Sequence, residues 1–348
     1  MTPTLEGSAM PEDTEPSRPR QGPSIYDVAK AAGVAASTVS RALSRPGRVN
    51  SETAERIRRV AMELGYRAHP LPRASATAPT SMIALAISDV TNPFYFEIIR
   101  GAQAAAAEAG YTMLLADAQE SDRLEREALD RAVPAVEGIV LASTRMSDSA
   151  LRMIAKQRPM IVLNRSISDV PSVVTDIPRG MLRAVEHLAA LGHESITYVG
   201  GPTASWTNGR RWVALREVAQ ELNIRARRIG PFPPTAEGGG LAVQTLGRDL
   251  PSAVLAYNDL MAIGVMRGLA AAGVQVPDDV SVVGFDNIFA AELVTPALTT
   301  VEAPLNKLGA TAVQHLLAIV GGAQPRRREP VVVPTRLVQR ESAGRRTR

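Results

Sequence analysis

The 348-residue sequence contains no cysteine and only four histidines. Without cysteine the chain can form no disulfide and no thiolate nucleophile, which fits a cytoplasmic protein. The histidines (His69, His187, His193 and His315) lack the spacing of metal ligands, and no phosphate-binding glycine motif follows a strand-like run. We therefore expect neither a metal nor another cofactor.

Long apolar runs are also missing from the sequence. No stretch approaches the roughly 18 uncharged apolar residues that a membrane-spanning helix needs, so we expect no membrane association. Residues 1–23 are polar, proline-rich and charged, which predicts a disordered tail and not a secretory signal.

Charge is unevenly distributed along the chain. Residues 24–75 hold nine Lys or Arg against four Asp or Glu, and residues 326–348 hold eight against two. Residues 76–325, in contrast, hold twenty against twenty-five. A basic segment beside an acidic body is expected where that segment contacts a polyanion such as nucleic acid. Charge alone leaves open the simpler alternative of a soluble protein with a basic tail.

After Met82 the chain alternates short apolar runs with helix-like segments, which predicts βαβ units and a doubly wound α/β fold. The runs are Ile83–Ile87, Met113–Ala116, Gly138–Leu141, Met160–Leu163, Ser172–Thr175, Ile196–Val199, Ala253–Ala256 and Val280–Val283. This core extends over residues 82–342, and residues 343–348 form a basic tail. Before it, residues 24–68 are predicted to form a small helical domain and the proline-containing residues 69–81 a linker.

The helical domain has the pattern of a helix-turn-helix. Ser24 is placed to cap a first helix, Gly33 to adopt the left-handed conformation of a tight turn, and Asn50 to cap a third helix. The second helix turns Val39 and Leu43 inward, so its polar residues face outward. The predicted fold is thus a small all-α domain followed by an α/β core.

Two stretches of this domain, Ile25–Leu43 (IYDVAKAAGVAASTVSRAL) and Glu52–Tyr66, resemble the DNA-binding head of the LacI/GalR family of sugar-responsive repressors. The resemblance continues through nearly the whole chain and implies that the second helix lies in the major groove of operator DNA. It implies base reading by Ala36 and Ser37, and makes Arg41 the best candidate for guanine recognition. The full set of implied DNA contacts is Tyr26, Ala36, Ser37, Thr38, Ser40, Arg41, Arg48 and Arg73.

Three positions depart from the family pattern. Ala35 stands where the family usually has a serine that caps the recognition helix, and losing such a cap costs about 1 kcal/mol. In the linker, Pro72 and Ser75 replace an alanine and the leucine that wedges into the minor groove. We therefore hypothesise weak or absent kinking of the DNA by a leucine wedge, unless Leu71 takes that place.

The same resemblance implies an effector core like a type I periplasmic binding protein, with two α/β subdomains of doubly wound parallel sheets across a cleft. The first subdomain would contain residues 82–176 and 304–330, and the second residues 177–303 and 331–342. Ligands of such sheets bind beyond the carboxyl ends of strands. The implied effector-binding residues are Asn92, Phe94, Tyr95, Asn164, Arg165, Arg211, Phe232, Asn258 and Asp286.

These side chains suit a sugar-like ligand. Asp286 would accept hydrogen bonds from two adjacent hydroxyls, the arginines would donate, and the aromatic rings would stack on an apolar sugar face. Because the set contains two arginines, an anionic ligand such as a sugar acid or sugar phosphate remains an alternative to a neutral sugar. In addition, Glu302-Ala303 stands where sugar-binding members of the family often carry glutamine. Asn258 is alternatively a helix cap, and Phe94 or Tyr95 a core residue.

The sequence therefore predicts a bacterial, cytoplasmic and nucleoid-associated repressor of carbohydrate-metabolism genes. It would bind double-stranded, pseudo-palindromic operator DNA as a homodimer and respond to a small-molecule effector such as a sugar or sugar acid. Residues 326–348 lack leucine heptads, so no coiled-coil tetramer is expected. The alternative is a transporter's solute-binding protein, which the DNA-binding head disfavours. An enzyme is not expected because no nucleophile–base set is present.

Overall fold

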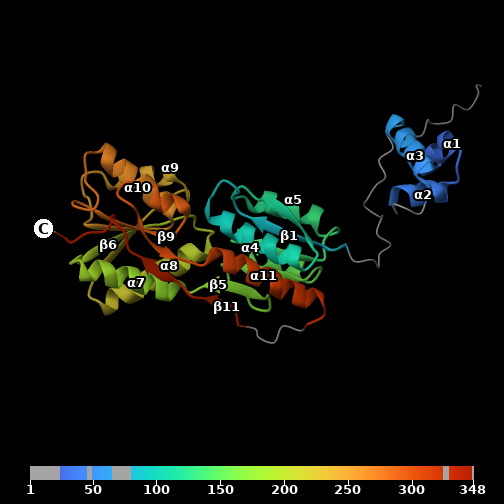
Figure 1. Ribbon diagram of the computed structural model, residues 1–348. Coiled ribbons are helices and arrows are strands. Elements are labelled where there is room, and N and C mark those ends of the chain that lie inside the picture. The colour runs from blue at the N-terminus through green and yellow to red at the C-terminus, as the bar shows by residue number, and fades with distance from the viewer. Residues whose placement is uncertain (1–23, 45–48, 65–79, 324–328, 347–348) are drawn as a thin grey trace, which may run out of the picture. The chain divides into compact units, whose positions relative to one another are not determined.

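The computed structural model describes residues 24–44, 49–64, 80–323 and 329–346 (Figure 1). These residues fall into two units, a helical head over residues 24–64 and a core over residues 80–346. Within the described part of the chain, no helix has the length and apolar character needed to cross a membrane.

Three helices form the head: α1 Ile25–Ala32, α2 Ala36–Ser44 and α3 Ser51–Glu63. Val28, Val39 and Ile57 meet at its centre and are fully buried. The local signals act as predicted. The Ser24 backbone N–H donates to Asp27 Oδ2 at 2.7 Å, Gly33 has φ +64°, and Asn50 Oδ1 accepts a hydrogen bond from the Thr53 N–H at 2.8 Å.

The first subdomain of the core is a six-stranded, wholly parallel sheet in the order β11-β5-β4-β3-β1-β2. Its central strand β3 is buried along its whole length, as its continuous apolar sequence requires. The strands are β1 Met82–Ile87, β2 Thr112–Asp117, β3 Gly138–Ala142, β4 Met160–Leu163, β5 Ser172–Thr175 and β11 Val331–Val333. The helices are α4 Phe94–Glu108, α5 Asp122–Ala132, α6 Asp148–Ala155 and α11 Leu305–Val320.

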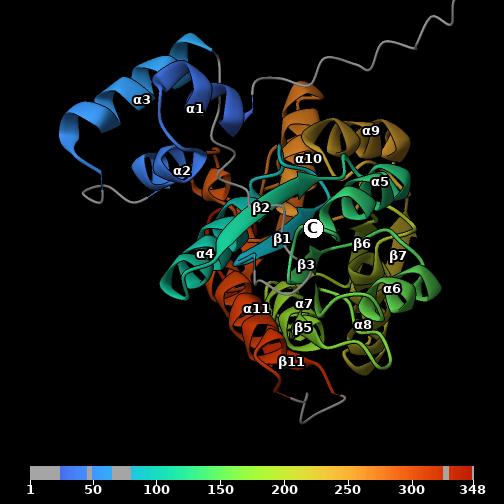
Figure 2. The same cartoon turned by 90° about the vertical axis from the view of Figure 1, so that its right-hand side faces the viewer.

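The second subdomain repeats this architecture in the strand order β12-β10-β9-β8-β6-β7, and only β12 is antiparallel to its neighbour. Figures 1 and 2 show helices on both faces of each sheet. The strands are β6 Ser195–Val199, β7 Arg225–Ile229, β8 Ala253–Ala256, β9 Ser281–Asp286, β10 Thr299–Glu302 and β12 Arg336–Val338. The helices are α7 Ile177–Ala190, α8 Trp206–Glu221, α9 Ala236–Leu246, α10 Asp259–Ala271 and the 3₁₀ helix η1 Phe289–Glu292.

The chain crosses between the subdomains three times, after β5, after β10 and between β11 and β12. The sequence placed the last crossing near residue 330, but β11 pairs with β5 and so belongs to the first subdomain. The crossing itself is therefore the short link between Val333 and Arg336. Thr335 Oγ1 donates to the Asp176 carbonyl at 2.8 Å, which ties this link to the first crossing.

Candidate functional site

The exposed face of α2 carries the side chains that the sequence assigned to DNA. Ser37, Ser40 and Arg41 are exposed, Ala36 and Thr38 are half-buried, and Tyr26 on α1 is exposed. Arg41 lies back along its own helix, with Nε 3.1 Å from the Ser37 carbonyl oxygen and Nη2 3.3 Å from Ser37 Oγ. The exposed side of α2 therefore carries hydroxyl and guanidinium groups, which can form hydrogen bonds with base edges and phosphates.

The remaining predictions for DNA contact fall elsewhere. Arg48 and Arg73 lie outside the described residues, as do Leu71, Pro72 and Ser75 of the linker. The hypothesis of a weakened leucine wedge stays a prediction.

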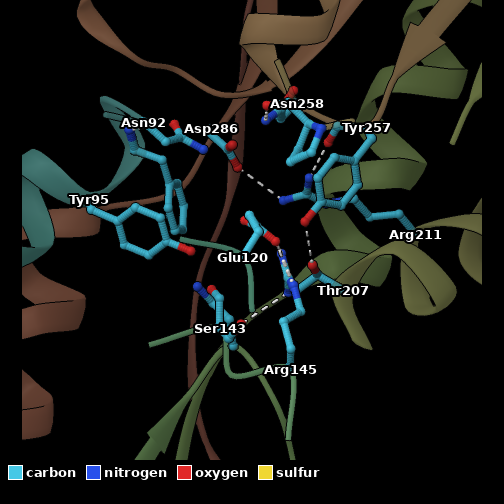
Figure 3. A pocket seen from close by; sticks show the side chains of 13 residues that line it. Asn92, Tyr95, Glu120, Ser143, Arg145, Thr207, Arg211, Tyr257, Asn258 and Asp286 are labelled. Carbon is cyan, nitrogen blue, oxygen red and sulfur yellow. Dashed lines mark hydrogen bonds and ion pairs between the residues drawn. The ribbon is translucent and has the colours of Figure 1, made fainter. Parts of the chain in front are cut away.

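A cavity lies between the two subdomains of the core, beyond the carboxyl ends of strands from both sheets (Figure 3). Its volume is about 20 Å³, which is room for about one water molecule. A monosaccharide can therefore enter only when the walls of the cleft move apart. The lining residues are Asn92, Phe94, Tyr95, Glu120, Ser143, Arg145, Asn164, Thr207, Arg211, Pro234, Tyr257, Asn258 and Asp286.

Seven of the nine predicted effector residues line this cavity, and Arg165 and Phe232 do not. Arg165 follows Asn164 but turns the other way, and its guanidinium donates to the Met146 carbonyl at 2.6 Å and pairs with Asp148. Phe232 packs against the core of the second subdomain, while its N–H donates to the Gly200 carbonyl at 3.0 Å. Pro234, two residues further along, lines the cavity instead.

Arg211 on α8 and Asp286 at the end of β9 form a buried ion pair on the wall of the second subdomain. Arg211 Nη2 lies 3.0 Å from Asp286 Oδ1. The guanidinium also donates to the Tyr257 carbonyl and lies over the Phe285 ring, 3.6 Å from its centroid. Burial raises the pKa of Asp286 to about 7, although Arg211 opposes this shift by stabilising the carboxylate.

The turn that follows β9 is held by a second buried carboxylate. Asp259 is fully buried, and its oxygens accept hydrogen bonds from Thr300 Oγ1 at 2.6 Å and from the Ile288 N–H at 2.9 Å. Gly284 leaves room for it, since a Cβ there would lie 2.1 Å from Asp259 Oδ1. Asp286 itself has φ +116°, a strained value that this turn imposes and that directs its carboxylate into the cleft.

The three predicted asparagines differ in what they already bind. Asn258 Oδ1 caps α10 by accepting from the Met261 N–H at 2.9 Å, and its amide donates to the Pro234 carbonyl at 3.1 Å. Asn92 Oδ1 accepts from the Phe94 N–H at 3.0 Å. Asn164 is buried, and its Oδ1 has no hydrogen-bond partner among the residues that the structure describes. Since buried polar atoms are normally satisfied, Asn164 Oδ1 is a ready acceptor for a ligand hydroxyl.

Phe94 and Tyr95 fit both predictions made for them, that of an effector contact and that of a core residue. Both side chains are buried in the core, and both line the cavity. Their rings meet edge to face, with centroids 5.0 Å apart and planes at 83°. They are therefore core residues whose outer edges form a wall of the cleft.

Sequence reasoning missed six lining residues, namely Glu120, Ser143, Arg145, Thr207, Pro234 and Tyr257. Arg145 is paired with Glu120, whose Oε2 lies 2.7 Å from Arg145 Nη2. The Tyr257 hydroxyl lies 3.0 Å from Ser205 Oγ and 3.3 Å from Thr207 Oγ1. Ser143, Arg145 and Tyr257 could have been found, because they follow β3 and β8 in the same way that Asn164 follows β4.

A second contact joins the subdomains outside the cavity. Phe96 on α4 and Phe289 on η1 stack with their ring centroids 6.4 Å apart and their planes at 15°. Both rings are exposed to solvent over much of their surface. Because α4 and η1 belong to different subdomains, this stack joins the two subdomains in the arrangement described here.

Two family models match the chain. Residues 24–69 match the model for bacterial regulatory proteins of the lacI family, and residues 185–343 match a periplasmic binding protein-like domain. The chain is 32% identical to the HTH-type transcriptional regulator DegA of Bacillus subtilis over 92% of this chain and 98% of the relative. It is 32% identical to the HTH-type transcriptional repressor CytR of Escherichia coli over 84% of this chain and 88% of the relative.

Solved structures show the same similarity in space. The lac repressor dimer bound to operator and the anti-inducer ONPF superposes with a TM-score of 0.73 at 26% identity, covering 93% of this chain and 100% of the other. A LacI family transcriptional regulator from Enterococcus faecium with bound ribose superposes with a TM-score of 0.67 at 29% identity, covering 76% of this chain and 99% of the other. The architecture of head and two-subdomain core is thus shared.

Proposed function

This chain belongs to the lacI family of bacterial regulatory proteins, and from that premise we propose that it represses carbohydrate-metabolism genes under the control of a sugar-like effector. One observation supports the effector's place above all others. The cavity gathers a buried ion pair, an unsatisfied asparagine oxygen and aromatic edges at the carboxyl ends of strands from two sheets. A polyol needs this combination of paired donors and acceptors beside apolar walls.

The head supplies sequence recognition in this proposal. Its second helix enters the major groove, where Arg41 donates two hydrogen bonds to a guanine edge and Ser37 contacts a neighbouring base. To reach the base, Arg41 exchanges its bonds to Ser37 for bonds to DNA. The exposed hydroxyls and Tyr26 contact phosphates and so fix the register of the helix on the duplex.

The core supplies the response. A ligand bound between Arg211 and Asp286 on one wall and Asn164 on the other bridges the two subdomains. It shifts the equilibrium between open and closed clefts only because it binds one of them more tightly. The closed cleft leaves about 20 Å³, so the ligand enters an opened form and its size then sets the final angle between subdomains.

The dimeric assembly is inferred from structural relatives of this chain. The lac repressor dimer was solved bound to operator, and other structural relatives were solved with cellobiose or ribose. We infer a homodimer on a pseudo-palindromic operator, acting in the cytoplasm on the DNA of the nucleoid. Rotation of one subdomain against the other then changes the spacing of the two heads relative to the half-sites.

The test begins with selection of bound duplexes from a pool of random DNA, because the operator is not defined by the sequence of the protein. We expect an inverted repeat whose affinity falls steeply with salt concentration. A panel of sugars is then screened for thermal stabilisation and for a change in operator affinity. Sugar binding without selection of any DNA sequence would favour the alternative of a solute-binding protein.

A further inference from the structure

The cleft contains two arginine–carboxylate pairs, one on each wall. Arg211 and Asp286 form the pair on the second subdomain, and Glu120 and Arg145 form the pair on the first. Figure 3 shows the two pairs on opposite sides of the cavity. The pair formed by Glu120 and Arg145 has no role in the proposal above, although both of its side chains line the cavity.

Three of the five N–H donors of Arg145 are used within its own subdomain. Nε and Nη2 each lie 2.7 Å from Glu120 Oε2, and Nη1 donates to the Ser143 carbonyl at 3.0 Å. The Arg145 backbone N–H donates to Glu125 Oε2 at 3.1 Å, which fixes the loop after β3. The positive charge of the guanidinium is therefore already compensated by Glu120 before any ligand binds.

Glu120, in contrast, keeps one free acceptor. Its Oε2 receives both bonds from Arg145, whereas its Oε1 accepts no hydrogen bond within the described part of the chain. The backbone that positions the Glu120 side chain is strained, because Gln119 and Glu120 have left-handed φ values of +48° and +57°, respectively. The Glu120 N–H also donates to the Ser88 carbonyl at 2.6 Å. Strain of this kind persists only where neighbouring structure imposes it.

We propose that Glu120 is a specificity-determining residue that accepts a hydrogen bond from a hydroxyl of the effector and excludes anionic sugars. The inference rests on the proposed sugar-binding function of the cleft. A neutral polyol donates to Glu120 Oε1 on one wall and to Asp286 on the other. A sugar acid or sugar phosphate instead places a second negative charge beside the Glu120 carboxylate, and solvent screens this repulsion less in the cleft than on the open surface.

The experiment compares matched pairs of a neutral sugar and its anionic derivative: ribose with ribonate and ribose 5-phosphate, glucose with gluconate, and galactose with galacturonate. Affinities are measured by calorimetry on the full chain at pH 8, so that Asp286 is ionised. We expect the wild type to bind at least one neutral sugar and its anionic partner at least about a hundredfold more weakly, which corresponds to about 2.7 kcal/mol.

Glu120→Gln keeps the shape and an acceptor oxygen but removes the charge, leaving Arg145 uncompensated. We expect the ratio of anionic to neutral affinity to rise at least about tenfold in this variant. Glu120→Asp keeps the charge and should keep the exclusion of anions. Glu127→Gln, on the exposed surface of α5 where Glu127 pairs with Arg123, is the matched control and should leave the ratio unchanged. Operator binding and circular dichroism confirm that each variant is folded.

Three results overturn the inference. Tighter binding of the anionic member by the wild type, or an unchanged ratio in a folded Glu120→Gln variant, shows that Glu120 does not select charge, while the sugar-binding function stands. Binding of no sugar by the wild type overturns both the inference and the proposed class of effector. Operator selection, measured separately, then shows whether the DNA-binding function remains.

Discussion

Arg211 and Asp286 lie 3.0 Å apart across the inner wall of the second subdomain, and each side chain exposes only 6% of its surface. The pair joins α8 to the end of β9, two elements 75 residues apart in sequence. Removing one member of a buried ion pair leaves the other charge unpaired and desolvated. The pair therefore matters for stability before any ligand binds.

We predict that Arg211→Ala lowers the free energy of unfolding by about 3–5 kcal/mol. Urea denaturation followed by circular dichroism measures this change. The double variant Arg211→Met with Asp286→Leu should lose much less, because apolar side chains of similar size leave no buried charge. The control is Arg183→Ala, which breaks the exposed pair with Glu186 and should cost less than about 1 kcal/mol. Equal losses from Arg211→Ala and Arg183→Ala would contradict the role of burial.

The pKa of Asp286 predicts how stability depends on pH. Burial raises this pKa from 3.8 to about 7, so between these values the folded state binds more protons than the unfolded state. Stability contributed by this group therefore falls as pH rises from about 4 to 7. Asp259, whose pKa burial raises to about 6, acts in the same direction.

Asp286→Asn cannot ionise and should flatten this dependence. We expect the difference in melting temperature between variant and wild type to move in favour of the variant as pH rises from about 4 to 7 and to level off above 7. Thermal unfolding at half-unit steps of pH measures it. A difference in melting temperature that stays constant between about pH 4 and 7 would show that Asp286 has its ordinary pKa in the folded protein.

Arg41→Ala tests base recognition by α2. Loss of a bidentate contact with guanine costs about 1–3 kcal/mol, so operator affinity should fall between about fivefold and 150-fold. Fluorescence anisotropy with the selected operator and with a copy mutated at one guanine measures it. The variant should no longer distinguish the two duplexes, and Arg267→Ala on the exposed surface of α10 should still do so. If operator binding by Arg41→Ala depends less on salt concentration but still distinguishes the two duplexes, Arg41 contacts a phosphate and not a guanine.

The stack of Phe96 and Phe289 predicts a contribution to closure of the cleft. An aromatic pair of this kind contributes about 0.5–1.5 kcal/mol, so replacing either ring by alanine should weaken effector binding about two- to twelvefold. A double-mutant cycle on sugar affinity isolates the pairwise contribution. Leu241→Ala, which removes an exposed apolar side chain from α9, is the control. Additive effects of the two phenylalanine substitutions would show that the stack does not couple the subdomains.

Much of the fold was predictable because its signals are local. Ser24, Gly33 and Asn50 mark helix ends by their own chemistry, and the buried strands appear as continuous apolar runs. The strand β7 was missed because it lies at a sheet edge and its sequence RARRI alternates exposed arginines with partly buried residues. The short strands β11 and β12 carry too few residues to show any pattern.

The site was predictable as far as strand ends define it. The family resemblance pointed to Asn92, Asn164 and Asp286, in agreement with that rule, and the rule alone would have pointed to Arg145 had it been applied to β3. It failed for Arg165, the neighbour of Asn164. The direction of that side chain depends on Asp148, which approaches it only in the folded chain and which no local pattern reveals.

The last crossing has a consequence for synthesis of the protein. Residues 331–338 provide the edge strand of one sheet and the edge strand of the other, and the buried Ser342 hydroxyl then donates to the Val282 carbonyl of β9. Every other strand of both subdomains precedes them in the chain. Neither sheet can be completed before this segment leaves the ribosome, so both subdomains reach their final form together and expose open sheet edges until then.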